Sequence, residues 1–190
     1  MTSIEKQEYK PLHAWPQATT LTDLGELTAQ WLEGRLDHYP CYDGPIDPET
    51  VLLVEALAGF NRHGFLTIFS QPGQPIDEVG FGQRAAVAGF TSARVAKRLA
   101  RLGLQTDLLV MAFKPGKRGG YPVPVSLADG RPVTFQGRSW GNREFDCFAS
   151  ACSTQAMAAL EAAWKVSILD LQWGRNDYLW SQVARALSPT

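Results

Sequence analysis

The sequence predicts one domain of the α/β (or α+β) class: a mixed β-sheet of about five to six strands with about five helices packed on it. Segments with apolar residues at helical spacing alternate along the chain with short apolar runs of strand length. Of the 190 residues, 45% are hydrophobic and 19% are charged, which is typical of a globular domain. Six Trp and nine Phe supply large apolar side chains for its core.

Composition also argues against some classes of partner. The net charge of −1 and the pI near 6.3 give no overall attraction to nucleic acid or to anionic membranes. The chain begins without an apolar run after a basic start, and no stretch is long enough to span a bilayer. Cys41, Cys147 and Cys152 are an odd number, which is not typical of a disulfide framework and favours a reducing compartment. We therefore expect a cytoplasmic protein with no membrane partner.

The chain is expected to start with an extended lead-in. Residues 1–20 are polar and without periodicity, so we predict that they precede a single domain over 21–190 and that Trp15 pins them to it. The first helix has Asp23 in a capping arrangement. Its apolar residues recur at helical spacing: Leu24, Leu27, Trp31 and Leu32.

The next part of the chain predicts a loop, a helix and two strands. The prolines and glycines of 39–48 indicate a loop whose tyrosines and Asp43 are candidates to face a cleft. Asp47 suits the cap of a helix that ends at Gly64. Two strands with a helix after the second follow from the runs at 65–69 and 85–90 and from Ser92 as a cap.

The second half of the chain continues this alternation. The apolar run at 108–113 predicts a central strand, and Asp129-Gly130 predicts a hairpin between 123–126 and 132–136. The remaining elements are a helix opened by Ser153 or Thr154, a strand at 166–171, and a last helix capped by Asn176 and Asp177.

The first candidate site is the turn Ser70-Gln71-Pro72-Gly73, which closes a strand that follows Asn61-Arg62-His63-Gly64. A strand end of this kind presents hydroxyl, amide and backbone N–H groups at a sheet edge, where ligands are often held. If the next strand pairs antiparallel, Gln83 and Arg84 lie near Gln71. The alternative is structural: Gly64 ends a helix and Pro72-Gly73 is an ordinary turn.

The second candidate site is the segment 170–177. Trp173 and Arg175 could stack and hold an anion above the N-terminus of the last helix, where unpaired N–H groups favour negative charge. In the alternative, Asn176 and Asp177 only cap that helix and Trp173 completes the core.

Other residues give weaker signals. The basic residues at 94–118 could meet the phosphates of a nucleotide or RNA, although a solvated helix face explains them as well. The three histidines lack metal-ligand spacing, so we predict no metal. Cys152 precedes a predicted helix, which could lower its pKa and make it a nucleophile, although a small buried residue is the commoner fate.

Two resemblances extend these patterns. The strings Asn61-Arg62-x-Gly64-Phe65, Ser70-Gln71-Pro72-Gly73 and Trp173-Gly174-Arg175-Asn176-Asp177 resemble an uncharacterised family of actinobacterial proteins over most of the chain. More distantly, the pattern Thr67-x-x-Ser70-x-x-Gly73 within residues 50–113 is similar to the wybutosine-synthesising protein 3 family. That family is a group of tRNA-modifying methyltransferases, so the similarity implies methyl-transfer chemistry.

The leading hypothesis is a cytosolic protein that binds a polar, nucleotide-like small ligand, with an enzymatic role and any cofactor left open. The expected cleft is formed by Ser70, Gln71, Gln83, Arg84 and Arg175. Further candidates around it are Asn61, Arg62, Gly73, Trp173, Asn176 and Asp177. One alternative is a protein-protein interaction or regulatory module with Tyr39, Tyr42 and Tyr178 as exposed anchors. The other is RNA binding through the basic stretch 94–118.

Overall fold

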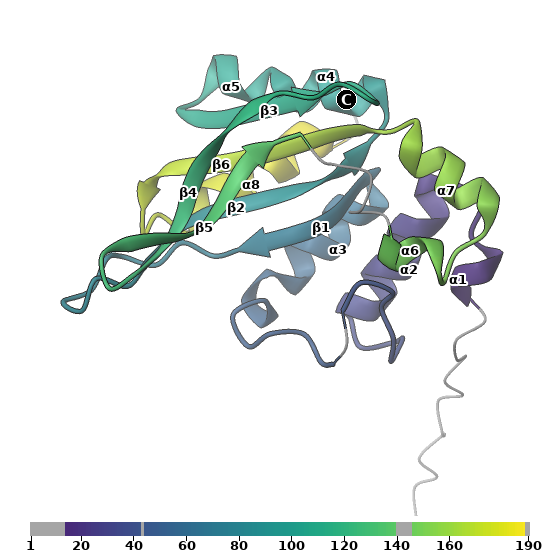
Figure 1. Cartoon of the computed structure of the whole chain (residues 1–190), viewed down its shortest axis with the longest axis horizontal. Helices are drawn as coiled ribbons and strands as arrows, with labels where there is room; N and C mark the ends of the chain where they lie inside the picture. The colour runs from purple at the N-terminus through teal and green to yellow at the C-terminus, as the bar shows by residue number, and fades with distance from the viewer. Residues whose placement is uncertain (1–13, 43, 140–145, 189–190) are drawn as a thin grey trace, which may run out of the picture.

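The computed structural model describes residues 14–42, 44–139 and 146–188, and it confirms the α/β class and the single domain (Figure 1). Its strands form a six-stranded antiparallel sheet in the order β3-β6-β2-β4-β5, with β1 also paired to β2. The strands are β1 (Phe65–Gln71), β2 (Gly82–Thr91), β3 (Leu108–Phe113), β4 (Gly120–Ala128), β5 (Arg131–Arg138) and β6 (Trp164–Trp173).

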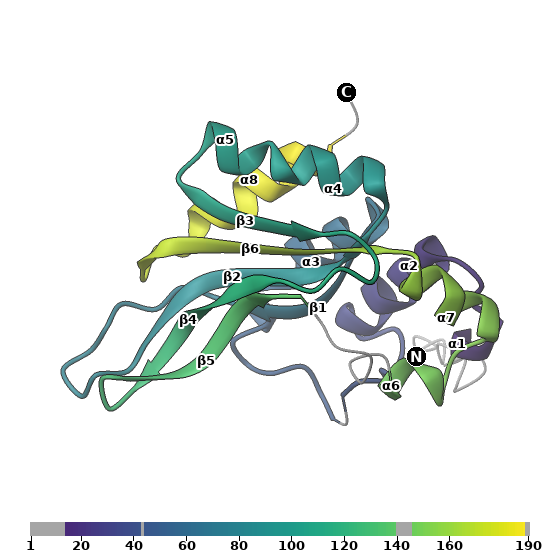
Figure 2. The same ribbon diagram turned by 45° about the horizontal axis from the view of Figure 1, so that its top comes forward.

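Helices cover one face and one end of the sheet. Figure 2 shows α3 and α8 behind the sheet and the β4-β5 hairpin in front of β2, while α1, α2, α6 and α7 gather at one end. None of the helices in the described ranges is long and apolar enough to cross a membrane. They are α1 (Ala14–Gln17), α2 (Leu21–Leu32), the 3-10 turn η1 (Val51–Leu53), α3 (Val54–Arg62), α4 (Ala93–Ala100), α5 (Leu102–Gln105), α6 (Asp146–Ala149), α7 (Thr154–Glu161) and α8 (Asp177–Leu187).

The main core lies between the sheet and helices α3, α4 and α8. Phe60, Phe65 and Ile168 are at most 2% exposed there, so they are removed from water almost completely. On the other face the side chain of Ala86 is small, which lets the hairpin lie directly on the sheet with Val125 packed against it. The sheet is therefore buried on both faces over β2.

Strand β3 is at the edge of the sheet, so the prediction of a central strand was wrong. Leu108 is buried, but the other five residues of β3 are only half-buried. The run is apolar throughout because both of its faces are partly covered: Val110 packs against the main core, and Met111 packs under the hairpin. A continuous apolar run thus indicates that both faces of a strand are covered, but it does not show whether the strand is central or at the edge of the sheet.

The hairpin at Asp129-Gly130 forms as predicted, but two helix starts differ from the prediction. Thr20 is the N-cap of α2, and Asp23 is the third helical residue that completes a capping box with it. Asp47 does not cap α3, because the chain first makes the 3-10 turn η1. Its carboxylate instead accepts a hydrogen bond of 2.8 Å from the Tyr42 hydroxyl.

Part of the lead-in is helical. The side chain of Trp15, in α1, is 2% exposed, and its indole N–H donates to the carbonyl oxygen of His38 at 3.1 Å. Trp15 therefore pins the start of the described chain to the loop before Tyr39. Residues 1–13 and Asp43 lie outside the described ranges.

Candidate functional site

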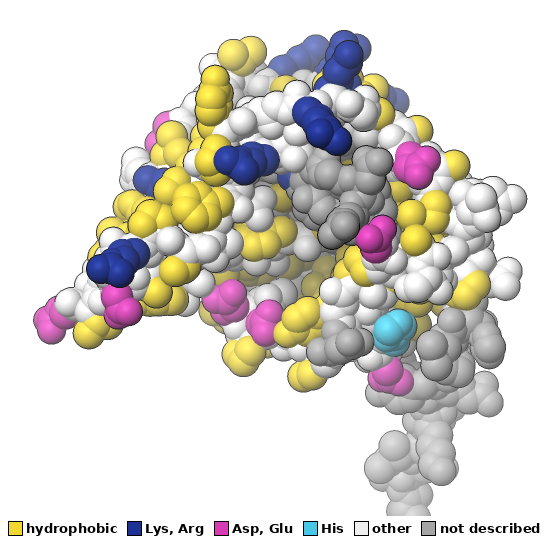
Figure 3. All heavy atoms as spheres, in the orientation of Figure 1, with side chains coloured by type: hydrophobic (Ala, Val, Ile, Leu, Met, Phe, Trp, Pro, Cys, Tyr) yellow, Lys and Arg dark blue, Asp and Glu magenta, His cyan; other side chains and the backbone are white. Residues whose placement is uncertain are grey.

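A cavity of about 460 Å³ lies against β1, between α2 and the segment 39–50. Figure 3 shows this region as a hollow floored by hydrophobic side chains, with acidic side chains along its lower rim. The residues that line it are Thr28, Trp31, Leu32, Tyr39, Cys41, Tyr42, Ile46, Asp47, Glu49, Thr50, Leu57, Thr67, Ile68, Phe69, Ser70, Gln71, Phe81, Gln83, Ser126 and Thr134.

Three of the sequence-predicted site residues meet at this cavity: Ser70, Gln71 and Gln83. Strands β1 and β2 pair antiparallel, as the proximity of Gln71 to Arg84 requires, and the Gln71 side-chain amide donates to the carbonyl oxygens of Arg84 (3.0 Å) and Val125 (2.8 Å). Both amide protons of Gln71 are therefore used by the fold, and its oxygen is the end available to a ligand.

Gln83 and Tyr39 each bring to the cavity a buried side-chain oxygen without a hydrogen-bond partner among the described residues. The side-chain nitrogen of Gln83 donates to a carboxylate oxygen of Glu49 at 3.1 Å. Gln83 is 7% exposed, and its side-chain oxygen is buried without a hydrogen-bond partner among the described residues. A buried amide oxygen without a partner costs roughly 1–3 kcal/mol. A donor group on a bound molecule would remove that cost.

The cavity is acidic. Asp47 and Glu49 line it, and no Lys, Arg or His is among the described residues that do so. The hydrogen bond to Asp47 raises the pKa of Tyr42, and burial raises the pKa of Tyr39, so both phenols are protonated at neutral pH. The charge and the unused acceptor oxygens favour ligands that carry hydrogen-bond donors or positive charge, and they disfavour phosphate.

Asn61 supports the cavity from behind. It is 1% exposed, and its side chain bonds to the carbonyl oxygen of Leu57 (2.8 Å) and to the hydroxyl and backbone N–H of Thr67 (2.7 and 3.0 Å). All of its contacts are therefore within the fold. Asn61 fixes Thr67, which lines the cavity, and it is a positioning residue.

Arg62 points away from the cavity. Its guanidinium bonds to Glu26 at 3.0 Å and to Glu33 at 2.6 Å, and so it ties α3 to α2. Arg62, together with Arg35, lowers the pKa of Glu33 to about 2. The ion pairs explain this residue without a ligand.

This network predicts a small loss of stability in acid. Because the pKa of Glu33 is lower in the folded chain than its ordinary 4.5, its contribution is complete above about pH 5 and is lost as the pH falls toward 2. The Glu33→Gln variant should lose that part of the pH dependence, by at most about 1 kcal/mol because the pairs are partly exposed. Urea unfolding from pH 6 to pH 3 measures it. Glu55→Gln, at an exposed site on α3, should keep the wild-type slope, and an equal change in both variants would contradict the assignment.

Gly73 and Asn176 join the β1 end to the start of α8. The backbone N–H of Gly73 donates to the side-chain oxygen of Asn176 at 3.1 Å, and a Cβ on Gly73 would lie 2.6 Å from the carbonyl oxygen of Arg175. Asn176 is the N-cap residue of α8, as predicted, but its side chain makes no cap hydrogen bond and instead accepts from the Trp180 indole. Asp177 is the first residue of α8.

The predicted stack of Trp173 on Arg175 does not form. Arg84 lies over the Trp173 ring at 4.3 Å, and Arg175 lies over Tyr178 at 4.2 Å. Neither arginine lines the cavity. Arg175 is also bonded to the fully buried Asp170, which neutralises the cation that was expected to hold an anion.

Sequence reasoning missed Glu49, Thr50 and the side chains of α2. Glu49 and Thr50 follow Pro48 directly, and the loop before them was expected to face a cleft. Proximity to that loop is the one signal that could have found them. The contact between Glu49 and Gln83 joins residues 34 positions apart, which no local pattern encodes.

The cysteines also differ from the prediction. Cys41 and Cys147 form a disulfide bond, so the reading of the odd number as evidence against disulfides was wrong. Cys152 is the free thiol among the described cysteines, and burial raises its pKa to about 11. A raised pKa is the opposite of what a nucleophile needs.

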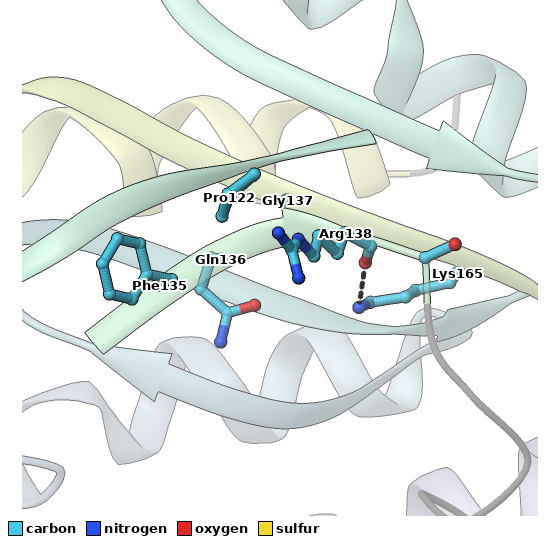
Figure 4. Close-up of a pocket in the computed structure, with 7 residues that line it drawn as sticks. Pro122, Phe135, Gln136, Gly137, Arg138 and Lys165 are labelled. Atoms are coloured by element: carbon cyan, nitrogen blue, oxygen red, sulfur yellow. Dashed lines mark hydrogen bonds between the residues drawn. The ribbon is translucent and has the colours of Figure 1, made fainter. Parts of the chain in front are cut away.

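Two further cavities lie on the hairpin side of the sheet. Figure 4 shows the first, of about 520 Å³, beside β5 and β6, where the Lys165 ammonium donates to the carbonyl oxygen of Arg138 at 2.6 Å. The second, of about 490 Å³, contains Lys114, Lys117 and Arg118 from the basic stretch, together with the acidic Asp146 and Glu161. None of the residues predicted for the polar-ligand cleft lines either cavity.

The anchors proposed for the alternative hypotheses are only partly exposed. Tyr39 is 5% exposed and stacks on Trp31, so it cannot serve as an exposed protein anchor, whereas Tyr42 is 38% exposed. Tyr178 lies under Arg175. In the basic stretch, Arg98 donates to the carbonyl oxygen of Leu187 at the end of α8.

Fold and site together define a small α/β domain with an acidic cavity beside an edge strand. The chain belongs to the family described as "Domain of unknown function (DUF6919)", whose model matches residues 11–190. It is also similar to Methylenetetrahydrofolate reductase 1 of Schizosaccharomyces pombe (strain 972 / ATCC 24843), with 36% identity over 59 residues. Those residues are 31% of this chain and 10% of the reductase, so the chain matches about a tenth of that protein's length.

Proposed function

We propose that this domain binds a phosphate-free, nucleoside-like small molecule in the cavity between β1 and segment 39–50. The observation that carries the proposal is the buried, unpartnered side-chain oxygen of Gln83 beside the carboxylate of Glu49. Two adjacent acceptors of this kind suit the hydroxyl or amino groups of a ligand.

The size and lining of the cavity support such a ligand. A volume of about 460 Å³ is within the usual range for small-molecule sites. Trp31, Tyr42 and Phe81 supply aromatic surface for a planar ring, and Ser70 and Thr50 supply hydroxyl groups. The sequence predicted a nucleotide-like ligand. The acidic lining favours a ligand without phosphates, because the phosphates of a nucleotide would lie close to Asp47 and Glu49.

The resemblances suggest which compounds to test. Similarity to the tRNA-modifying methyltransferase group motivates S-adenosylmethionine, which contains adenosine, carries positive charge and has no phosphate. The likeness to Methylenetetrahydrofolate reductase 1 motivates methylenetetrahydrofolate as a comparison compound, and we expect no stabilisation by it because its glutamate carboxylates would meet Asp47 and Glu49.

A thermal-shift panel tests the proposal. A ligand that binds only the folded chain stabilises it by about 2.7 kcal/mol at one hundred times its Kd. We expect S-adenosylmethionine or adenosine to raise Tm, and AMP and ATP to leave it unchanged. Stabilisation by ATP but not by the phosphate-free compounds would instead favour a site for phosphates, such as the basic cavity at Lys114, Lys117 and Arg118.

A substitution at Glu49 tests whether the compound binds in the cavity. Glu49→Gln keeps the size of the side chain and removes its charge, so we expect binding of S-adenosylmethionine to weaken about tenfold or more. Glu78→Gln removes the same charge from an exposed position outside the cavity and should bind as the wild type does. Equal affinity of the two variants would show that Glu49 does not contact the compound.

A further inference from the structure

The cavity beside β1 has two different polar ends. Figure 1 shows α2 near the start of β1 and the turn of the β4-β5 hairpin beyond its end. Tyr39 belongs to the α2 end, where it packs in one cluster with Leu66, and Gln83 belongs to the hairpin end, where it pairs with Ser126. Between them residues 67–71 line the cavity, which is about 13 Å of strand. A ligand that fills the cavity therefore lies along β1 and meets both ends.

The hairpin end presents two adjacent hydrogen-bond acceptors. The bond of 3.1 Å from the Gln83 side-chain nitrogen to Glu49 fixes the orientation of the amide, because its oxygen would repel the carboxylate. The backbone of Gln83 is also fixed, by two hydrogen bonds of 2.9 Å with Gln74. The unpartnered oxygen of Gln83 is thus held beside the Glu49 carboxylate. Two such acceptors match two hydroxyl groups on neighbouring carbon atoms, as in ribose.

The α2 end presents a donor. The ring of Tyr39 is stacked on Trp31 with a centroid distance of 4.6 Å and meets the edge of Phe148 at 5.9 Å, so its hydroxyl is fixed in place. That hydroxyl is buried and has no hydrogen-bond partner among the described residues. Thr28 partly offsets the effect of burial on the Tyr39 pKa, but its own proton is donated to the carbonyl oxygen of Leu24 at 2.8 Å. Burial keeps Tyr39 protonated at neutral pH, so its O–H can donate to a ligand.

We propose that the cavity selects ribonucleosides and binds them in one orientation, with the ribose hydroxyls on Glu49 and Gln83 and an acceptor nitrogen of the base on the Tyr39 hydroxyl. The inference rests on the proposed function and deepens it by naming the sugar as the recognised group. An unpartnered polar atom at each end destabilises the free chain, and the ligand supplies the missing hydrogen bonds. A deoxyribonucleoside lacks one hydroxyl and leaves an acceptor unpaired.

The wild-type chain tests the sugar contact without any substitution. In calorimetric titrations we expect adenosine to bind at least about tenfold more tightly than deoxyadenosine, which lacks one ribose hydroxyl. Equal affinities would overturn this inference and leave the proposed function standing. Absence of adenosine binding would also overturn it, and the separate result with S-adenosylmethionine then decides the proposed function.

Two variants test the orientation. Gln83→Met keeps the length of the side chain and removes its amide, so the preference for adenosine over deoxyadenosine should fall toward one. Tyr39→Phe keeps the ring and removes only the hydroxyl, so the affinity for adenosine should fall about tenfold while the preference for ribose stays. Tyr121→Phe removes a hydroxyl from an exposed position outside the cavity and should bind as the wild type does. Loss of the ribose preference in Tyr39→Phe but not in Gln83→Met would overturn the orientation.

Thermal unfolding without ligand separates a binding role of the Tyr39 hydroxyl from a structural one. Because this hydroxyl has no partner among the described residues, Tyr39→Phe should keep or raise the Tm of the free chain. A fall of about 3 °C or more, as expected for the loss of one hydrogen bond in a domain of this size, would show that the fold already uses the hydroxyl. That result would overturn the contact with the base.

Discussion

Replacing Arg175 by alanine is expected to lower the free energy of unfolding by about 3–5 kcal/mol. Its guanidinium makes two hydrogen bonds, of 2.5 and 2.9 Å, to the carboxylate of Asp170, which is fully buried. Removing the cation leaves a buried carboxylate whose remaining hydrogen-bond donor among the described residues is the backbone N–H of Gln172. Urea unfolding followed by circular dichroism measures the loss.

A second substitution tests the reason for that loss. If the cost comes from the unpaired buried charge, Asp170→Asn should recover part of the stability in the Arg175→Ala background, because the two residues are energetically coupled. Simple addition of the two single effects, or a loss below about 1 kcal/mol in Arg175→Ala, would show that the pair behaves like an exposed ion pair.

Gly89→Ala is expected to destabilise the domain by about 3 kcal/mol, which is at the upper end for overpacking. Gly89 sits in β2 opposite Thr67 of β1, and a Cβ there would lie 2.1 Å from the carbonyl oxygen of Leu66. Strand β1 would have to move away, and with it the wall of the cavity that carries Thr67 and Ser70. Thermal unfolding gives the loss of stability.

The same substitution at Gly59 is the matched control. Gly59 lies inside α3, where a Cβ would meet no heavy atom within 4 Å, so Gly59→Ala should stabilise the chain by about 0.5–1 kcal/mol. Opposite signs for the two variants would confirm that close approach at Gly89, and not the loss of a glycine, decides the outcome. A neutral Gly89→Ala would contradict the packing of β1 on β2.

Patterns within short segments predicted much of the fold. The β-branched and aromatic run at 65–69 and the Asp129-Gly130 turn each encode their own conformation, and both formed, the strand extending to Gln71. The antiparallel pairing of β1 with β2 then placed Gln71 next to Arg84. Local propensity was enough to predict these elements, because residues adjacent in the sequence specify each of them.

Most of the parts that the sequence did not reveal depend on contacts between residues far apart in the sequence. Arg175 was expected to hold an anion, but Asp170, five residues earlier, and the distant Asp107 both pair with it and neutralise its charge. Cys41 and Cys147 are 106 residues apart, and counting cysteines could not pair them. The role of Glu49 likewise depends on how segment 39–50 folds back onto β1. The periodic pattern of a helix or a strand relates only nearby residues, so it could not reveal the Cys41–Cys147 and Glu49–Gln83 contacts.

The most direct test of the cavity's role compares S-adenosylmethionine with ATP by calorimetric titration of the oxidised wild-type chain. The two compounds share adenosine and differ in the group attached to its ribose: one carries positive charge and the other carries phosphates. Because Asp47 and Glu49 line the cavity without a Lys, Arg or His among its described residues, we expect S-adenosylmethionine to bind and ATP to give no heat of binding. Binding of ATP in preference to S-adenosylmethionine would contradict the account.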